Sequence, residues 1–214
     1  MKRAKEEFLD RIEEYVPLVG KLVLEVGCGT GSRSIAIAER CKFLEAIEPD
    51  ESSLKVAARD SQAKNINFQK GEAQEVPFSN NKFDVIIFTL SLHHVPITLM
   101  EKAIDEAVRV SKIGGHVIFL EPAFSGSYFD AEINFGAGDG DERADKARAY
   151  FEILNYKNYT EIIEIDDETI FKLDSEEDFT KVFNPKKNLD KLPVFLNDNN
   201  FILNAMRRIN IYRV

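Results

Sequence analysis

The sequence has 214 residues, of which 44% are hydrophobic and 30% are charged, and its formal net charge is −9. This length and composition are typical of one soluble globular domain with a sizeable core. The acidic balance disfavours a nucleic acid or an anionic membrane surface as a partner, because both attract basic protein surfaces.

The sequence also indicates a protein of the reducing cytoplasm. Its two cysteines, Cys28 and Cys41, are too few for a disulfide framework. The first residues contain no apolar signal core, and no uncharged run approaches the roughly 20 residues that a membrane helix needs. We therefore expect a cytoplasmic protein without membrane insertion, and nothing in the sequence indicates an oligomeric state.

The N-terminal segment, residues 1–20, is predicted to form an amphipathic helix over residues 1–16. Phe8 and Ile12 share one face of this helix, and Pro17 ends it. Such a helix either caps a sheet or forms one wall of a ligand site.

Residues 21–122 alternate short apolar runs with helix-forming segments. The runs are nearly all apolar, as is typical of parallel strands that are covered on both faces. The predicted strands are residues 22–26, 43–47, 66–70, 83–88 and 116–120, and the predicted helices are residues 32–40, 51–61 and 98–110.

After residue 122 the composition changes, and aromatic residues stand among glycines and acids in residues 123–160. Residues 161–214 are expected to close the sheet. In this half of the chain, helices are predicted over residues 141–155 and 175–183, and strands over residues 161–165, 169–173 and 201–214.

Three glycines follow the first predicted strand at alternate positions, namely Gly27, Gly29 and Gly31. Glycine permits a positive φ and leaves no Cβ to block a ligand, and a helix that follows begins with unpaired N–H groups. Strand, glycine loop and helix in this order are typical of α/β proteins that bind nucleotide-like ligands. Dinucleotide folds use G-x-G-x-x-G, whereas Ser32 here occupies the place of the third glycine.

With Glu25 before the loop, the stretch reads E-x-G-x-G-x-G and resembles the first motif of the class I S-adenosylmethionine-dependent methyltransferases. Further positions agree in order, namely Glu48, the loop of residues 71–73, Thr89 and the turn of residues 109–115. The resemblance covers residues 20–122. It implies a single methyltransferase domain, in which a Rossmann-like α/β sandwich contains a mostly parallel, seven-stranded sheet and residues 21–122 bind the cofactor, S-adenosylmethionine.

The resemblance also implies roles for individual residues. Glu25 and the carbonyl of Gly27 suit the ammonium group of the cofactor, Glu48 suits the two ribose hydroxyls, and Glu72 suits the adenine amino group, although this loop of the family usually carries Asp. Cys28 is expected to contribute its backbone only. The cofactor-binding residues that follow from the resemblance are Glu25, Gly27, Cys28, Gly29, Gly31, Glu48, Pro49, Glu72, Ala73, Thr89 and Leu90.

His93 and His94 follow the fourth predicted strand of the cofactor-binding core. In this stretch the sequence resembles the type 11 and quinone C-methyltransferase group, which acts on small molecules. A histidine here either takes a proton from the acceptor during methyl transfer or packs and fixes the loop. In an extended segment two adjacent side chains point in opposite directions, and we expect His94 to lie nearer the cofactor.

In the family, substrate choice usually comes from the N-terminal helix and from the insert after the fifth strand, here residues 123–160. The aromatic side chains of this insert either form a lid over the cleft or pack as its own core. They are Phe124, Tyr128, Phe129, Phe135, Tyr150 and Phe151. No cluster of His, Cys and carboxylate residues suggests a metal site, and the acidic run of residues 139–142 is shorter than a calcium loop.

The function expected from the sequence is methyl transfer from S-adenosylmethionine to a small-molecule O, N or C acceptor. A non-catalytic protein of the same fold that binds S-adenosylmethionine or S-adenosylhomocysteine is one alternative. An NAD-dependent oxidoreductase is another, which the glycine spacing and the lack of a Tyr-x-x-x-Lys sequence disfavour. A nucleic-acid acceptor is not expected, because the stretch after residue 88 lacks an Asn-Pro-Pro-Tyr-like sequence.

Overall fold

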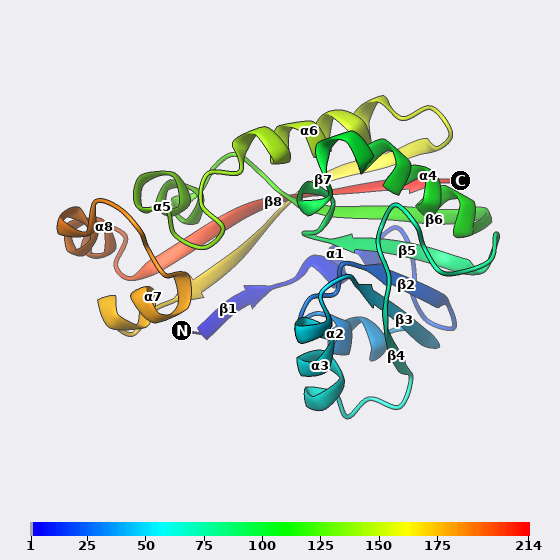
Figure 1. The fold of residues 1–214 in the computed structure, drawn as a ribbon, viewed down its shortest axis with the longest axis horizontal. Helices are drawn as coiled ribbons and strands as arrows, with labels where there is room; N and C mark the ends of the chain where they lie inside the picture. The colour runs from blue at the N-terminus through cyan, green and yellow to red at the C-terminus, as the bar shows by residue number, and fades with distance from the viewer. Residues whose placement is uncertain (1) are drawn as a thin grey trace.

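A computed structural model describes residues 2–214, with the side chains of residues 3–5 left out. The chain forms one eight-stranded sheet with helices on both of its faces (Figure 1). Along the sheet the strands follow the order β1-β7-β8-β6-β5-β2-β3-β4. No helix within residues 2–214 has both the length and the apolar character needed to cross a membrane.

Five neighbouring strands are parallel. They are β2 (Leu22–Val26), β3 (Phe43–Glu48), β4 (Ile66–Lys70), β5 (Phe83–Thr89) and β6 (Ser111–Pro122). Val26, the last residue of β2, pairs with Ile47 on one side and with Phe88 on the other. This register brings the carboxyl ends of β2, β3 and β5 to one edge, where ligands bind in open α/β sheets.

The three predicted helices between these strands are present. They are α2 (Ser34–Ala38), α3 (Glu51–Asp60) and α4 (Met100–Val110), with short 3₁₀ turns η1 (Leu92–His94) and η2 (Ile97–Leu99) before α4. Helix α3 begins at the predicted residue, and α2 and α4 begin two residues later than predicted. The Asp50 side chain caps α3 by accepting a hydrogen bond from the Ser53 N–H at 2.8 Å. The apolar faces of α2 and α4 pack on opposite faces of the sheet.

Two long strands complete the seven-stranded, mostly parallel sheet that the sequence predicts. β8 (Ile202–Arg213) runs antiparallel to both β6 and β7 (Thr160–Lys172). β7 is continuous, whereas two strands separated by Asp166 and Asp167 were expected. The acids do not interrupt it, because Asp167 is bonded to the buried Arg207 of β8.

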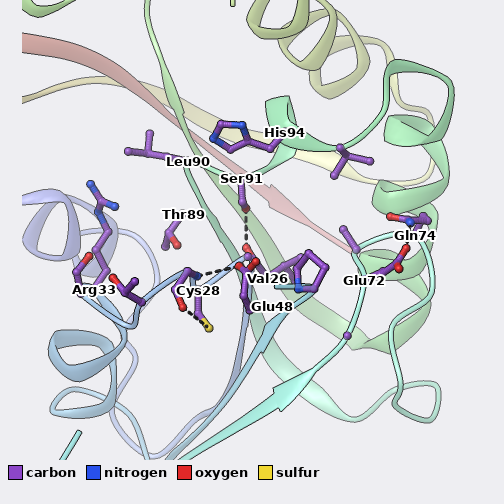
Figure 2. A pocket seen from close by; sticks show the side chains of 18 of the residues that line it. Val26, Cys28, Arg33, Glu48, Glu72, Gln74, Thr89, Leu90, Ser91 and His94 are labelled. Atoms are coloured by element: carbon purple, nitrogen blue, oxygen red, sulfur yellow. Dashed lines mark hydrogen bonds between the residues drawn. The ribbon is translucent and has the colours of Figure 1, made fainter. Parts of the chain in front are cut away.

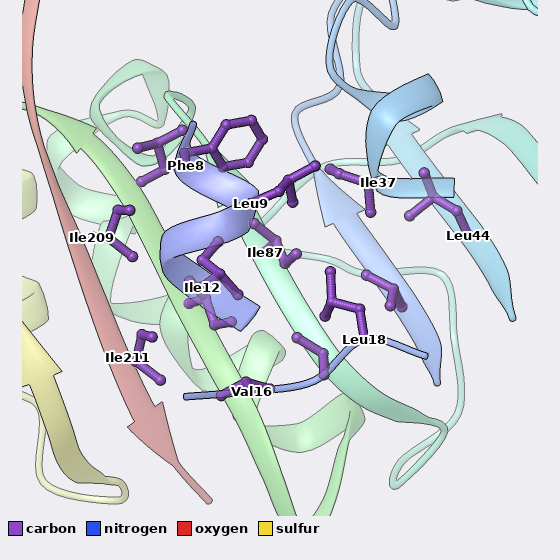
Figure 3. Packing of buried hydrophobic residues seen from close by; sticks show 14 of the residues in the cluster. Phe8, Leu9, Ile12, Val16, Leu18, Ile37, Leu44, Ile87, Ile209 and Ile211 are labelled. Atoms are coloured by element: carbon purple, nitrogen blue, oxygen red, sulfur yellow. The ribbon is translucent and has the colours of Figure 1, made fainter. Parts of the chain in front are cut away.

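The N-terminal segment departs from the predicted single helix. Lys2–Glu6 forms β1, an eighth strand antiparallel to β7, and α1 (Phe8–Glu13) follows. Pairing with β7 gives these backbone groups hydrogen-bond partners, which outweighs their helical pattern. Phe8 and Ile12 of α1 are buried against the sheet, so this helix caps it (Figure 3).

The ends of β7 and β8 extend beyond the parallel strands and carry a small additional core (Figure 1). Around them lie α5 (Ser127–Phe135), α7 (Glu176–Phe183), η3 (Leu189–Lys191) and α8 (Leu192–Asp198). α5 and α8 were not predicted from the sequence. We call these three helices and the strand ends the cap. α6 (Arg143–Asn155) joins the cap to the face that α4 covers.

Candidate active site

A cleft of about 690 Å³ lies at the carboxyl edge of the parallel strands (Figure 2). Its walls are the loop after β2, the end of β3, the loop of residues 71–74, and the segment after β5. Arg33 and Glu72 lie on opposite sides of it in Figure 2, and His94 lies beside Leu90 and Ser91. This is the place that the glycine loop predicts.

The three glycines of the loop serve different purposes. All have positive φ, +74° at Gly27, +53° at Gly29 and +76° at Gly31. A Cβ on Gly27 would lie 2.3 Å from Ser91 Cβ, and one on Gly31 would lie 3.0 Å from Ala57 Cβ, so both positions are fixed by packing. A Cβ on Gly29 would meet no atom within 4 Å. Gly29 therefore presents bare backbone to the cleft, as close approach of a ligand requires.

Glu48 ends β3 in the wall of the cleft. Its Oε2 accepts the N–H of Gly29 at 2.9 Å, and its Oε1 accepts the N–H of Asp50 at 3.1 Å. These backbone bonds fix the carboxylate against the glycine loop. Each oxygen retains acceptor capacity, which suits the vicinal hydroxyls of a ribose.

Glu25 lies behind the cleft and does not line it. The side chain is fully buried and accepts hydrogen bonds from the hydroxyls of Thr89, at 2.7 Å, and Ser34, at 2.5 Å. Burial raises the pKa of this carboxyl above its usual range, although both hydroxyls oppose the shift. Of Glu25, Ser34 and Thr89, it is Thr89 that lines the cleft. Glu25 is therefore connected to the cleft by its hydrogen bond with Thr89.

The remaining predicted cofactor residues are distributed as follows. Cys28, Pro49, Glu72, Ala73 and Leu90 line the cleft, whereas Gly31 does not. Burial raises the pKa of the Cys28 thiol above its usual range, which fits the expectation that only its backbone contributes. Leu90 has φ +60°, an uncommon value for a residue with a side chain, and its N–H donates to the Leu120 carbonyl at 2.8 Å.

His93 and His94 lie in the η1 turn and not in the extended segment that was expected, so their side chains are arranged differently. Their ring centroids are 4.2 Å apart, so they do not point in opposite directions as they would from an extended segment. His94 is half exposed and lines the cleft, whereas His93 is buried and does not. The prediction that His94 is the nearer of the two to the cofactor remains a prediction.

Glu121, at the end of β6, fixes the η1 turn. Its Oε1 accepts the N–H groups of Ser91, at 3.1 Å, and Leu92, at 2.8 Å, and its Oε2 is bonded to His93 Nδ1. Burial by itself lowers the pKa of His93, but Glu121 and Glu142 outweigh it and the pKa is raised. The role of Glu121 could not be predicted from the sequence, because its partner His93 is distant in the chain and contacts it only across neighbouring strands.

A second cavity of about 130 Å³ adjoins the cleft, and the two share Leu90, His94 and Asp139 as lining residues. Its other walls come from α5, α6 and β8, including Phe129, Met206 and the buried pair of Lys146 and Glu132, 2.8 Å apart.

The aromatic residues of the insert have several different environments. Tyr128 and Phe129 line the second cavity. Phe135 is buried in the core of the cap, and Phe151 is 52% exposed. Tyr150 packs under Arg208, whose guanidinium carbon lies 3.6 Å from the ring centroid. Part of the insert is therefore core and part borders the second cavity, and a lid over the cleft remains a prediction.

The structure also brings together a group that the sequence analysis missed. Glu142, just before α6, lies beside both histidines, with its Oε1 3.4 Å from His94 Nδ1 and its Oε2 3.9 Å from His93 Nε2. We call His93, His94 and Glu142 the His–Glu group. Glu142 belongs to the acidic run of residues 139–142, and no short spacing in the sequence connects it with the histidines.

Comparison with known proteins places this geometry in a family. Residues 24–119 match the family model described as a methyltransferase domain. A ubiquinone biosynthesis O-methyltransferase of Coxiella burnetii is 33% identical over 113 residues, which are 52% of this chain and 47% of that protein. A phthiotriol/phenolphthiotriol dimycocerosates methyltransferase of Mycobacterium leprae is 28% identical over 135 residues, 62% of this chain and 49% of that protein. The chain thus spans about half the length of the curated relatives that it matches.

A solved structure of a protein from Bacillus halodurans C-125 is similar in fold, with a TM-score of 0.67 at 18% identity over 97% of this chain and 99% of that one. The structure therefore has a Rossmann-like α/β fold with a glycine-lined cleft. The match of residues 24–119 and the methyltransferase relatives support the class I S-adenosylmethionine-dependent methyltransferase family for this part of the chain. The family and the fold predicted from the sequence are confirmed, and S-adenosylmethionine is the cofactor of that family.

Proposed function

We propose that this protein binds S-adenosylmethionine in the cleft and transfers its methyl group to a small-molecule acceptor in the second cavity. The observation that carries the proposal is that the two cavities share Leu90, His94 and Asp139. A donor in the first and an acceptor in the second would therefore meet at His94. The names of the two curated relatives, one referring to ubiquinone biosynthesis, support a small molecule with an O, N or C acceptor atom.

The residues of the cleft fit the chemistry of this cofactor. Glu48, held by two backbone N–H groups, would accept the ribose hydroxyls, and residues 72–73 would border the adenine. Thr89 and Leu90 would border the methionine end, together with the backbone of residues 27–29. The cofactor carries an ammonium and a sulfonium charge, and the carboxylate of Glu48 in the wall of the cleft would favour both electrostatically.

S-adenosylmethionine supplies, when bound, a methyl group that is already activated on sulfur. The chain must then hold the acceptor in line with that methyl group and exclude water, which can supply much of the rate. Phe129 and Met206 give the second cavity an apolar wall for the acceptor. We assign removal of an acceptor proton to the His–Glu group, whose His94 belongs to both cavities.

The test is release of S-adenosylhomocysteine from S-adenosylmethionine in the presence of phenolic, amine and carbon-acid acceptors. We expect turnover with at least one of these classes, and we expect His94→Ala to lower kcat while S-adenosylhomocysteine affinity is kept. Retained affinity without turnover on any acceptor would favour the non-catalytic alternative. Reduction of NAD with an alcohol substrate would favour the oxidoreductase.

A further inference from the structure

The His–Glu group places electron-pair donors of three side chains around one point. His93 Nε2, His94 Nδ1 and the Glu142 carboxylate contribute one atom each, and these atoms all lie within 4.8 Å of one another. A neutral imidazole has one acceptor nitrogen and an ionised carboxylate has acceptors only, so the three atoms are all acceptors when His93 Nε2 and His94 Nδ1 are the unprotonated nitrogens. Such a set is satisfied by a cation between them.

The group is held in an orientation that suits a metal ligand. His93 Nδ1 is bonded to Glu121, and in the neutral tautomer that donates the Nδ1 proton to Glu121 the Nε2 lone pair faces Glu142. Glu121 is itself buried and fixed by the N–H groups of Ser91 and Leu92. A carboxylate behind a histidine in this way is the usual arrangement around histidines that bind metals.

The local charge also favours a cation. Glu121, Glu132 and Asp139 lie around the group, which itself contains Glu142, and Lys146 is a positive side chain among them. Lys146 Nζ lies 2.8 Å from Glu132 and 3.6 Å from Glu142, so its charge is balanced mainly by Glu132. The acidic side chains around the histidines therefore outnumber the positive ones, and the site is partly buried.

We propose that the His–Glu group binds a divalent transition-metal ion, with Zn²⁺ as the best fit. Two imidazoles and one carboxylate form the ligand set of catalytic zinc sites. Ligand atoms about 2.0–2.2 Å from an ion lie roughly 3.3 Å from one another. Each histidine faces a different oxygen of Glu142 near this separation, since His94 Nδ1 lies 3.4 Å from Oε1 and His93 Nε2 lies 3.9 Å from Oε2. The His94 side chain, which is 50% exposed, has room to close the remaining gap.

An ion at this point would have an open position toward the second cavity, because all three ligands line that cavity. If the proposed function holds, on which this role rests, the ion would replace the free histidines in this step. It would favour the ionised form of an acceptor hydroxyl, whose proton would pass to solvent water. Binding of the ion itself does not depend on methyl transfer.

The experiment is titration of chelator-treated protein with Co²⁺, read by its visible d–d absorption, and then with Zn²⁺ in competition. We expect one Co²⁺ per chain and its displacement by Zn²⁺ but not by excess Mg²⁺. His94→Ala and Glu142→Gln should each weaken Co²⁺ binding by about tenfold or more, with unchanged far-ultraviolet circular dichroism. His116→Ala, at the third histidine, should leave it unchanged.

Absence of Co²⁺ binding, or binding that both variants retain, would overturn the metal site. His93 is not used as a variant because its burial makes misfolding an alternative explanation. The titration contains neither cofactor nor acceptor, so its failure would leave the methyltransferase proposal standing, and failure of methyl transfer would leave the metal site standing.

Discussion

Gly29 and Gly20 share a positive φ and open space where a Cβ would stand, but only Gly29 lines the cleft. The two residues therefore form a matched pair for separating backbone strain from ligand contact. Alanine at either position should cost about 1 kcal/mol of stability, because it places a side chain in the left-handed region.

We predict that Gly29→Ala weakens S-adenosylhomocysteine binding by about tenfold, which corresponds to about 1.4 kcal/mol. The added methyl group would occupy the space that the cofactor approaches. Gly20→Ala should bind like the wild type, and calorimetric titration compares the three proteins. If the wild type and both variants bound S-adenosylhomocysteine with equal affinity, the glycine loop would not be part of the binding site.

Glu25 gives a prediction about pH. Its pKa is raised in the folded protein, so above the pKa of the unfolded chain the folded state holds a proton that the unfolded state has lost. The stability contribution of this group is therefore present at low pH and is lost as pH rises through the folded pKa.

Glu25→Gln removes this titration while keeping the size of the side chain. The free energy of unfolding of the wild type minus that of the variant should decrease as pH rises from about 4 toward neutral. Urea unfolding of both proteins across this range measures the difference. A difference that increases with pH would mean that the pKa of Glu25 is lowered by its partners.

At the scale of elements, a buried ion pair joins the long strands to the N-terminal strand. Arg207 of β8 is 2% exposed, donates from Nε to Asp167 of β7 at 2.7 Å, and donates from Nη1 to Glu6 of β1 at 2.7 Å. Removing one partner of a buried pair leaves the other charge uncompensated.

Asp167→Asn should therefore lower the free energy of unfolding by about 3 kcal/mol. The neighbouring Asp166 is exposed, so Asp166→Asn is the matched control and should change stability little. Denaturant titration at neutral pH gives both values. Equal stability of Asp167→Asn and Asp166→Asn would mean that the ion pair of Arg207 with Asp167 does not stabilise the packing of these strands.

At the scale of the whole molecule, the sequence predicted the parallel half of the sheet well. Strands such as Leu22–Val26 and Ile66–Lys70 are short and bounded by clear turns, and their predicted bounds are those of the structure. Many residues of the cleft follow from this regularity, because they lie at or just after the carboxyl end of such a strand. Glu48 and Thr89 are examples, since each ends its strand at the same edge.

The rest depended on contacts between distant parts of the chain. β1 exists because β7 offers an edge, and Asp167 remains inside a strand because Arg207 lies opposite. The pairing of His93 with Glu121 and the approach of Glu142 likewise come from tertiary packing. No local spacing in the sequence indicates these contacts. The second cavity and the His–Glu group could therefore be recognised only in the structure.

The most direct measurement is calorimetric titration of the purified wild-type protein with S-adenosylhomocysteine, with NADH as the parallel ligand. In the proposed function the cleft holds an adenosine whose ribose meets Glu48, and the glycine spacing differs from that of dinucleotide folds. We predict one S-adenosylhomocysteine bound per chain and no binding of NADH. Binding of NADH alone, or of neither ligand, would contradict the assignment of this cleft to S-adenosylmethionine.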